Sequence, residues 1–403
     1  MSCCLLAITR KHSTSPAMAQ KPLTILIGAD TFPPDVNGAA KFTVRLVVGL
    51  ISRGHRVVVV SPSPDTEFGL RREVHEGVEI EVYRLRSWKW FNHPWMRFAL
   101  PWEVQRDTAE ILDTVKPDVV HVQSHINVGW GLVRQTHRRE IRIVATNHFM
   151  PENAAQFVPL PQFVLDWLAR MLWNAAAKTY RMVNVITTPT HKAADYLEKA
   201  VGIAGIHAIS CGLNVSNYRP VLGKRNDPYA LFLGRVEQEK HIEELLYATT
   251  RFAPTELRIV IAGAGDDRGR LEKISRDLGI ADRVDFRGLV SDEELVTLLS
   301  EAAVFVMPST AELQSIATME AMASALPVVA ANAMALPHLV HDGANGFLYE
   351  PRDIDGMAGA IRTVLRSSDE RYREFQQESL RIVADHDIST TLDRFEQIYR
   401  SSN

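Results

Sequence analysis

Short runs of apolar, largely β-branched residues alternate along the chain with longer segments in which apolar residues recur every three or four positions. The short runs are typical of buried strands and the longer segments of amphipathic helices, so the alternation predicts βα units and parallel sheets. In the first half, the predicted strands are residues 23–28, 56–61, 78–84, 118–123, 141–147 and 185–188, and the predicted helices are residues 39–53, 102–115, 127–139, 161–182 and 190–200.

The same rhythm restarts after residue 228, with predicted strands at residues 229–234, 257–263, 283–287, 303–307, 327–331 and 346–349. Residues 212–228 hold Asn214, Asn217, Pro220, Asn226 and Pro228, a composition that neither a helix nor a buried strand favours. We therefore predict an α/β protein of two doubly wound, Rossmann-like domains that face each other across a central cleft.

The predicted boundaries follow from this division. Residues 1–20 are expected to form a disordered tail, residues 21–211 the N-terminal domain and residues 212–228 the linker. Residues 229–385 are expected to form the C-terminal domain, and residues 386–403 a helix that packs back on the first domain.

Composition adds limits to this picture. A chain of 403 residues exceeds the size at which one core stops growing, which favours two domains. The formal net charge of -3 provides no overall attraction to nucleic acid. Three cysteines are too few for a disulfide framework and indicate a reducing compartment, so we expect a cytoplasmic protein. No run of 18 apolar residues occurs, so no membrane span is expected.

Two cations follow the first predicted strand of the second half. Residues 229–234 lead into Arg235, and Lys240 comes five positions later. A diphosphate can be bound by such a set of groups. The Arg235 guanidinium can bind it in a bidentate manner, the Lys240 ammonium adds a positive charge, and Gly234 lets the backbone approach closely. The same residues also fit an ordinary solvated turn, so the spacing alone leaves both interpretations open.

Two carboxylates lie near the start of a later predicted helix. Glu312 falls in the loop after the strand at residues 303–307, and Glu320 falls in the second turn of a helix that begins near Ser315. Both can reach a ligand at the helix N-terminus, where free backbone N–H groups suit a phosphate and carboxylates accept hydrogen bonds from sugar hydroxyls. A loop acid and a helix-surface acid are the alternative.

These residues resemble a known family, the family 4 retaining glycosyltransferases of GT-B fold, which carry a Glu-x7-Glu motif. The chain reads Glu312-x7-Glu320-Ala-Met-Ala, followed by Val340-His-Asp-Gly343-Ala-Asn-Gly346. The resemblance covers nearly the whole chain and includes bacterial lipid-directed mannosyl- and glucosyltransferases, such as phosphatidylinositol mannosyltransferases and glycosyl-diacylglycerol synthases. It implies that residues 21–211 form an acceptor-binding domain and residues 229–385 a nucleotide-sugar-binding domain.

The resemblance implies that Arg235 and Lys240 bind the donor diphosphate and stabilise it as it leaves, that Glu320 holds the ribose and that Glu312 contacts the transferred sugar. The remaining residues that it assigns to the site are His148, which hydrogen-bonds the sugar, and Gly38, Leu313, Gln314 and Ser315, which contact the donor. One departure is Ser315, which stands where the family prefers a glycine.

A possible acceptor surface lies in residues 82–102, which contain no acidic residue. Basic side chains alternate here with tryptophans, a pattern that suits an anionic membrane and a lipid acceptor. The residues concerned are Arg86, Trp88, Lys89, Trp90 and Trp95. A partly buried loop that packs its aromatic residues inward is the alternative.

The resemblance therefore implies a retaining hexosyltransferase that moves mannose or glucose from GDP-mannose or UDP-glucose to a membrane glycolipid or phospholipid. We expect it to use no metal and no cofactor and to act on the inner face of the plasma membrane. The alternatives are a soluble acceptor, a sugar-nucleotide epimerase, a catalytically silent carbohydrate-binding protein and an NAD-dependent oxidoreductase. The last rests on Gly263-Ala-Gly265, whose spacing to Gly269 does not fit the dinucleotide motif.

Overall fold

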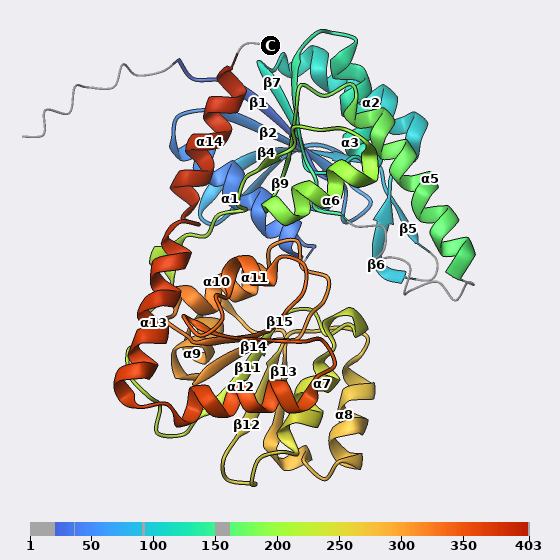
Figure 1. Ribbon diagram of the computed structural model, residues 1–403. Helices are drawn as coiled ribbons and strands as arrows, with labels where there is room; N and C mark the ends of the chain where they lie inside the picture. Colours follow the sequence, from blue (N-terminus) through green and yellow to red (C-terminus); the bar gives the residue numbers. More distant parts are fainter. Residues whose placement is uncertain (1–20, 36, 91–92, 150–161, 402–403) are drawn as a thin grey trace, which may run out of the picture.

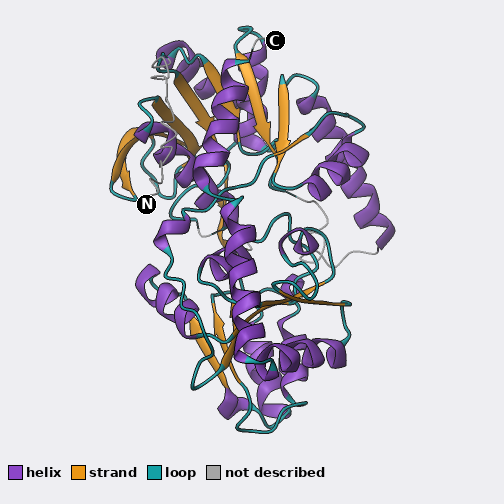
Figure 2. Ribbon diagram, turned by 60° about the vertical axis from the view of Figure 1, so that its left-hand side comes forward, coloured by secondary structure: helices purple, strands orange, loops and turns teal. Residues whose placement is uncertain are grey.

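The computed structural model describes residues 21–35, 37–90, 93–149 and 162–401, so the predicted tail at residues 1–20 lies outside the described part of the chain. Figures 1 and 2 show two α/β domains, one above the other, each with a sheet between layers of helices. The predicted α/β architecture with two parallel sheets is confirmed.

The first sheet has eight strands in the order β10-β9-β8-β7-β1-β2-β4-β3. All neighbours in it pair in parallel except β3 and β4. Its strands are β1 (Thr24–Gly28), β2 (Arg56–Pro62), β3 (Gly69–His75), β4 (Val78–Leu85), β7 (Val119–Val122), β8 (Arg142–Thr146), β9 (Val185–Thr188) and β10 (His207–Ala208). Its helices are α1 (Gly38–Ser52), α2 (Pro101–Val115), α3 (Asn127–His137), α5 (Gln162–Tyr180) and α6 (His191–Val201).

The second sheet has six parallel strands in the order β13-β12-β11-β14-β15-β16. They are β11 (Tyr229–Leu233), β12 (Arg258–Ala262), β13 (Val284–Gly288), β14 (Val304–Met307), β15 (Val328–Ala331) and β16 (Gly346–Tyr349). The helices after the linker are α7 (Ile242–Thr249), α8 (Arg268–Asp277), α9 (Asp292–Glu301), α10 (Ile316–Ala323), α11 (Leu336–Leu339), α12 (Ile354–Arg366), α13 (Asp369–Ala384) and α14 (Ile388–Arg400).

Four of the described strands were not predicted: β3, β5, β6 and the two-residue edge strand β10. β3 lies at the edge of the first sheet, and its residues alternate between exposed and half-buried, so they lack the apolar run of a central strand. β5 (Trp88–Trp90) and β6 (His93–Phe98) form a separate antiparallel hairpin in the segment interpreted above as an acceptor surface.

The last helix of the chain completes the core of the first domain. Figure 1 shows α13 beside the second sheet and α14 beside the first. Leu392, Phe395 and Tyr399 of α14 are buried among Ile25, Val57 and other residues of the first sheet and α1. At the crossing, the backbone of Leu213 receives a hydrogen bond from Ile388 and donates one to His386, so two segments pass side by side between the domains.

An ion-pair cluster also fastens α14 to α1. The guanidinium of Arg53 lies 2.6 Å from both Asp393 and Glu396, and the His55 ring lies 2.6 Å from the other oxygen of Glu396. Burial would raise the pKa of Glu396, but hydrogen bonds from His55 and Arg53 outweigh burial and lower it. The cluster therefore favours the ionised carboxylate in the folded state.

We expect Phe395→Ala to destabilise the first domain by about 3–5 kcal/mol, because Phe395 is fully buried and its removal leaves a cavity. Thermal unfolding followed by calorimetry would measure the loss. Gln397→Ala, on the exposed side of the same helix, is the matched control and should unfold like the parent protein. Equal melting temperatures for all three proteins would contradict the role given to α14.

Candidate active site

Arg235 and Lys240 lie in the turn that follows β11, and each has a carboxylate partner. The Arg235 guanidinium donates to Glu239 at 2.6 Å, and the Lys240 ammonium donates to Glu312 at 2.6 Å. Lys240 and Glu239 are buried, whereas the Arg235 side chain is 47% exposed. Two cations and an acid from one turn thus form a compact charged cluster with Glu312, which is 72 residues away from Lys240 in the sequence.

Two glycines of the loop after β12 support this turn. A Cβ atom on Gly263 would lie 1.8 Å from the carbonyl oxygen of Gly234, and one on Gly265 would lie 2.1 Å from that of Val236. The Val236 N–H also donates to the Ala264 carbonyl at 2.9 Å. Close backbone packing against the turn that carries Arg235 therefore explains why these two positions are glycine. The glycines no longer support the interpretation of this loop as a dinucleotide-binding loop.

Residues 312–315 form the loop that leads from β14 into α10. Glu312 lies in this loop and Glu320 lies inside α10, as the sequence predicts. Ser315 is the N-cap of α10 and has a φ of 71°, in the left-handed region. Its hydroxyl lies 2.8 Å from the Thr318 hydroxyl. The position at which the family prefers glycine therefore has a backbone conformation that glycine adopts without strain.

The same loop contacts the first domain. The Leu313 carbonyl accepts a hydrogen bond from Thr190, the N-cap of α6, at 3.0 Å. The Gln314 amide accepts from the Cys211 N–H at 2.8 Å and donates to the Ser210 hydroxyl at 2.7 Å. The Gln314 side chain is buried in these contacts, so a donor contact from this residue has to come from its backbone.

Glu320 is buried and faces the first domain. Its carboxylate accepts a hydrogen bond from the Tyr218 hydroxyl at 3.1 Å and lies 3.5 Å from Arg45 and 3.8 Å from Lys41. Arg45 and Lys41 are four residues apart on α1, so they project from the same face of that helix. Lys41, Arg45 and Tyr218 were not predicted as site residues. The spacing of Lys41 and Arg45 could have indicated the two cations, but nothing in the sequence pointed to Tyr218.

Gly38 begins α1 and lies opposite α10. A Cβ atom built on Gly38 would lie 3.6 Å from the Ile316 side chain, in the first turn of α10. Asn37 caps α1 by accepting a hydrogen bond from the Ala40 N–H at 2.9 Å. The structure therefore brings Gly38, Ser315 and Glu320, predicted from separate motifs, to one place between the domains.

His148 lies just beyond β8, at the carboxyl edge of the first sheet. Its Nε2 atom donates to the Gln123 side-chain oxygen at 3.0 Å, and its ring centre lies 5.1 Å from that of Phe42. Burial lowers the pKa of His148 to about 4, so the ring is neutral at pH 7. A neutral imidazole can exchange hydrogen bonds with a sugar but carries no charge.

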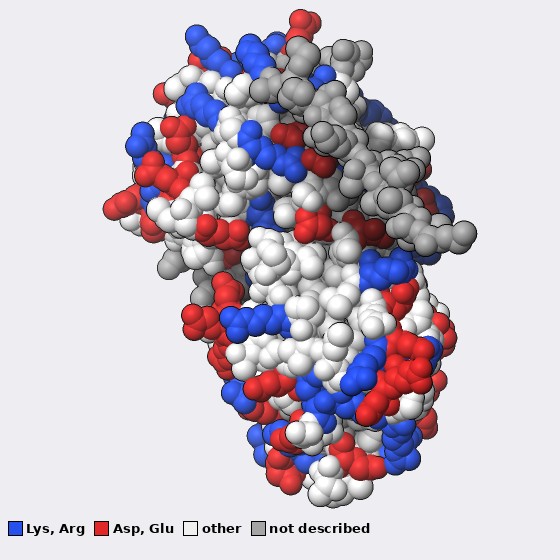
Figure 3. All heavy atoms as spheres, turned by 90° about the vertical axis from the view of Figure 1, so that its left-hand side faces the viewer, with Lys and Arg blue, Asp and Glu red and all other residues white. Residues whose placement is uncertain are grey.

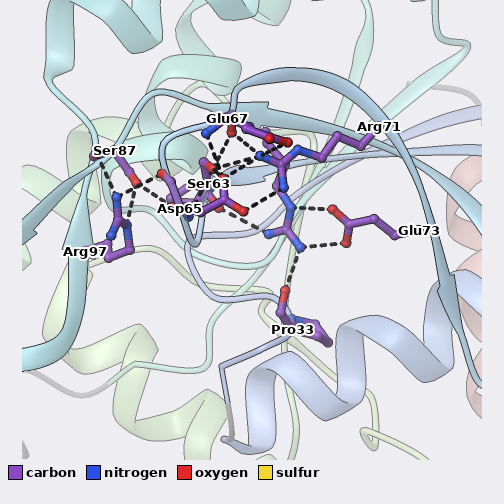
Figure 4. Close-up of polar contacts among 10 residues, drawn as sticks. Pro33, Ser63, Asp65, Glu67, Arg71, Glu73, Ser87 and Arg97 are labelled. Carbon is purple, nitrogen blue, oxygen red and sulfur yellow. Dashed lines mark hydrogen bonds and ion pairs between the residues drawn. The ribbon is translucent and has the colours of Figure 1, made fainter.

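Two further arginines of the segment at residues 82–102, Arg84 and Arg97, are held by contacts inside the first domain. Arg84 is buried, and its guanidinium donates to Glu73 at 2.8 and 2.7 Å and to the Pro33 carbonyl at 2.6 Å. Figure 4 labels its partners Glu73 and Pro33. Figure 4 also shows Arg97 bound to Ser87, at 2.7 Å. Both arginines therefore brace loops of the first domain and do not form an open basic surface.

Arg86 and Trp88, the two residues of the proposed acceptor surface whose side chains the structure describes, are exposed. The Arg86 guanidinium packs over the Phe68 ring and lies 3.7 Å from Glu103, and Trp88 is 47% exposed. The side chains of Lys89, Trp90 and Trp95 lie outside the described residues. On the face that carries α13 and α14, acidic and basic residues are intermixed, so that face offers no continuous basic surface (Figure 3).

Within the described residues, no group of three or more His, Cys, Asp or Glu side chains is placed to hold a metal ion. No helix in the described ranges combines the length and the apolar character that a bilayer span requires.

Comparison with known families covers most of the chain. Residues 36–217 match the family model described as "Glycosyltransferase Family 4", and residues 214–380 match the model described as "Glycosyl transferases group 1". The first match includes Gly38 and His148, and the second includes Arg235, Lys240, Glu312 and Glu320. Both matches agree with the family resemblance inferred from the motifs.

Three curated proteins illustrate the similarity. The chain is 25% identical to a sulfoquinovosyl transferase of Arabidopsis thaliana, over 88% of this chain and 69% of that protein. It is 27% identical to a GDP-mannose-dependent alpha-mannosyltransferase of Mycobacterium tuberculosis (80% and 83%). It is 25% identical to an alpha-monoglucosyldiacylglycerol synthase of Acholeplasma laidlawii (82% and 86%).

Two solved structures show the same fold. Sucrose-phosphate synthase from Thermosynechococcus elongatus superposes with a TM-score of 0.79 at 20% identity, over 94% of this chain and 98% of that one. Anabaena HepE in complex with UDP and glucose superposes with a TM-score of 0.74 at 16% identity, over 94% and 100%. The two-domain arrangement is therefore shared along the full length of both neighbours.

Ser315 provides a test of the loop geometry. We expect Ser315→Val to destabilise the protein by about 1–2 kcal/mol, because a β-branched side chain is strained at a positive φ. The melting temperature should fall by roughly 2–8 °C. Ser315→Gly should retain the fold, and Ser300→Val within α9 is the control. A Ser315→Val variant as stable as the parent protein would contradict the strained backbone.

Proposed function

The chain belongs to the family 4 glycosyltransferases of GT-B fold, which use nucleotide-sugar donors, and on this basis we propose that it transfers mannose or glucose to a membrane lipid with retention of anomeric configuration. The observation that carries the proposal is the charged cluster of Arg235, Lys240 and Glu312 beside the start of α10. The proposed donor is GDP-mannose or UDP-glucose.

The cluster suits a diphosphate that replaces internal partners. Lys240 and Arg235 now bind Glu312 and Glu239, and a diphosphate bridging the two cations would compete for the same donors. The first N–H groups of α10 and the positive end of its dipole would attract the same anion. Glu312, once released from Lys240, would then be free to accept hydrogen bonds from sugar hydroxyls.

In the transfer step, the bond between the anomeric carbon and the diphosphate oxygen breaks and a bond to an acceptor oxygen forms. Negative charge grows on the departing diphosphate, and Arg235 and Lys240 are placed to stabilise it. His148 would hold a hydroxyl of the sugar, and Glu320 would hold the ribose in exchange for its contacts with Tyr218 and Arg45. The acceptor proton would leave with the diphosphate.

A lipid acceptor is supported first by one relative, the alpha-monoglucosyldiacylglycerol synthase, whose name specifies a diacylglycerol lipid. The choice of donor sugars is supported by this glucosyl-lipid synthase and by the GDP-mannose-dependent alpha-mannosyltransferase. The reaction would then take place on the cytoplasmic face of the plasma membrane.

Helix α5 adds support from the structure. Phe163, Trp167 and Met171 are 74%, 59% and 47% exposed and follow one another at every fourth residue, so they form an apolar ridge along one side of the helix. Figure 1 shows α5 on the outer side of the first domain. Arg170 and Lys178 are also exposed on this helix. An apolar ridge with flanking cations fits the interface of an anionic bilayer.

We expect Arg235→Ala and Lys240→Ala each to lower kcat/KM for the donor at least about 10-fold, equivalent to about 1.4 kcal/mol, because each removes a charge that stabilises the leaving group. Release of nucleoside diphosphate from UDP-glucose and GDP-mannose would measure the rates. Arg381→Ala, which removes an exposed arginine paired with Glu378, is the matched control. Full activity in either site variant would rule out this donor site.

We expect the double variant Phe163→Ser/Trp167→Ser to bind vesicles of phosphatidylglycerol and phosphatidylcholine at least about 10-fold more weakly, because burying each side chain contributes about 1.5–3 kcal/mol. Co-sedimentation would measure binding, and added salt should weaken it. Tyr247→Ser on α7 of the second domain is the control. If the parent protein does not bind the vesicles but does glycosylate a soluble acceptor, the result would favour the soluble-acceptor alternative.

A further inference from the structure

A series of hydrogen-bonded side chains connects helix α14 to His148. The Tyr399 hydroxyl of α14 lies 2.7 Å from His121 Nδ1, and His121 Nε2 lies 3.3 Å from the Gln123 amide nitrogen. The Gln123 amide oxygen then lies 3.0 Å from His148 Nε2. Tyr399, His121 and Gln123 are all buried in the core of the first domain.

The strand order brings these residues together. β7 and β8 are parallel neighbours, with Val122 paired to Ala145. Gln123 follows the last residue of β7, and His148 lies two residues beyond β8, so both side chains stand at the same carboxyl edge. His121 lies one layer deeper in β7, where it contacts α14. The series therefore connects the interior of the domain to the edge that faces the donor loop.

The amide orientation fixes where the protons lie. A side-chain oxygen only accepts, so His148 must carry its proton on Nε2 to donate to Gln123. The Gln123 NH₂ group donates to His121 Nε2, which must then be bare, and the His121 proton lies on Nδ1, facing the Tyr399 oxygen. Thr146 donates to the same bare Nε2 at 2.7 Å and lies 2.7 Å from Thr187.

We propose that Gln123 is a positioning residue that holds His148 in the Nε2–H tautomer, so that His148 Nδ1 accepts a hydrogen bond from a hydroxyl of the transferred sugar. The inference rests on the sugar contact of His148 given under the proposed function. His121 and Tyr399 hold the Gln123 amide in this orientation. The tautomer decides the direction of the bond: His148 acts on the sugar as an acceptor, and the hydroxyl must donate.

The energetic cost of this arrangement supports a role beyond packing. Placing imidazole, amide and phenol groups in a protein interior costs free energy unless each is hydrogen-bonded. Burial lowers the pKa of His121 to about 3 and that of His148 to about 4, so both rings are neutral and each has one donor and one acceptor nitrogen. When each group in a series has one donor and one acceptor, the donor–acceptor direction of every hydrogen bond in the series is fixed. Apolar side chains of similar volume would fill the same space without fixing any such direction.

The test uses the full-length protein with ¹⁵N-labelled histidine. Two-dimensional NMR distinguishes the protonated nitrogen of a neutral imidazole from the bare one, and a His148→Asn sample assigns the His148 signals. We expect the parent protein to show His148 protonated on Nε2. Gln123→Met should remove that preference, whereas Gln123→Glu, which keeps an acceptor oxygen at this position, should retain it. Gln135→Met, at a buried glutamine of α3, is the matched control.

Kinetics provide a second readout. We expect Gln123→Met to lower kcat for sugar transfer about 10-fold, as one well-placed hydrogen bond is lost, while the Kd for the free nucleoside diphosphate, which lacks the sugar, stays unchanged. Tyr399→Phe should cause a smaller loss of kcat, since Gln123 remains in place. A purely structural defect would instead weaken nucleotide binding and lower the melting temperature together with kcat.

The outcomes separate this inference from the proposed function. His148 protonated on Nδ1 in the parent protein, or an unchanged tautomer in Gln123→Met, would overturn the positioning role. A changed tautomer with unchanged kcat would overturn the link between tautomer and transfer. His148→Ala with full activity would instead remove the sugar contact assigned to His148, whatever the tautomer shows.

Discussion

The position of the loop at residues 312–315 is the constraint on which the rest of the site depends. The buried Gln314 amide binds Ser210 and Cys211, and Thr190 binds the Leu313 carbonyl, so the first domain holds a loop of the second. This anchoring places Glu312 against Lys240 and sets the left-handed Ser315 at the start of α10. Because the loop is held from both sides, a change in the angle between the domains must also move the residues that meet the donor.

Every charged group assigned to the donor already has a partner inside the protein. Lys240 binds Glu312, Arg235 binds Glu239, and Glu320 lies beside Tyr218 and Arg45. Buried charges require such pairing, since an isolated one would be costly. A ligand therefore binds only to the extent that its contacts with these groups are more favourable in free energy than the internal ion pairs and hydrogen bonds that it replaces. A diphosphate with a ribose and a sugar offers replacements for all three pairs at once, whereas a single phosphate does not.

Local patterns in the sequence were sufficient for every described parallel strand except the two-residue β10, and for the Glu-x7-Glu motif, because both depend on residues close together in the chain. The edge strand β3 and the hairpin of β5 and β6 were missed, since they lack a continuous apolar run. Arg45 opposite Glu320 and Tyr399 opposite His121 depend on contacts between distant segments. The buried ion pair of Arg84 with Glu73 and the inward-facing Gln314 side chain also arise only from tertiary packing.

The return of α14 to the first domain has a consequence for how the protein is made. Leu392, Phe395 and Tyr399 belong to the same apolar core as Ile25 and Val57, although more than three hundred residues of chain separate them. During synthesis, the first domain emerges from the ribosome long before these side chains exist as part of the chain. An apolar face of the sheet and of α1 therefore stays uncovered until α14 has been translated. Folding of the N-terminal half thus depends on a helix that is synthesised more than three hundred residues later.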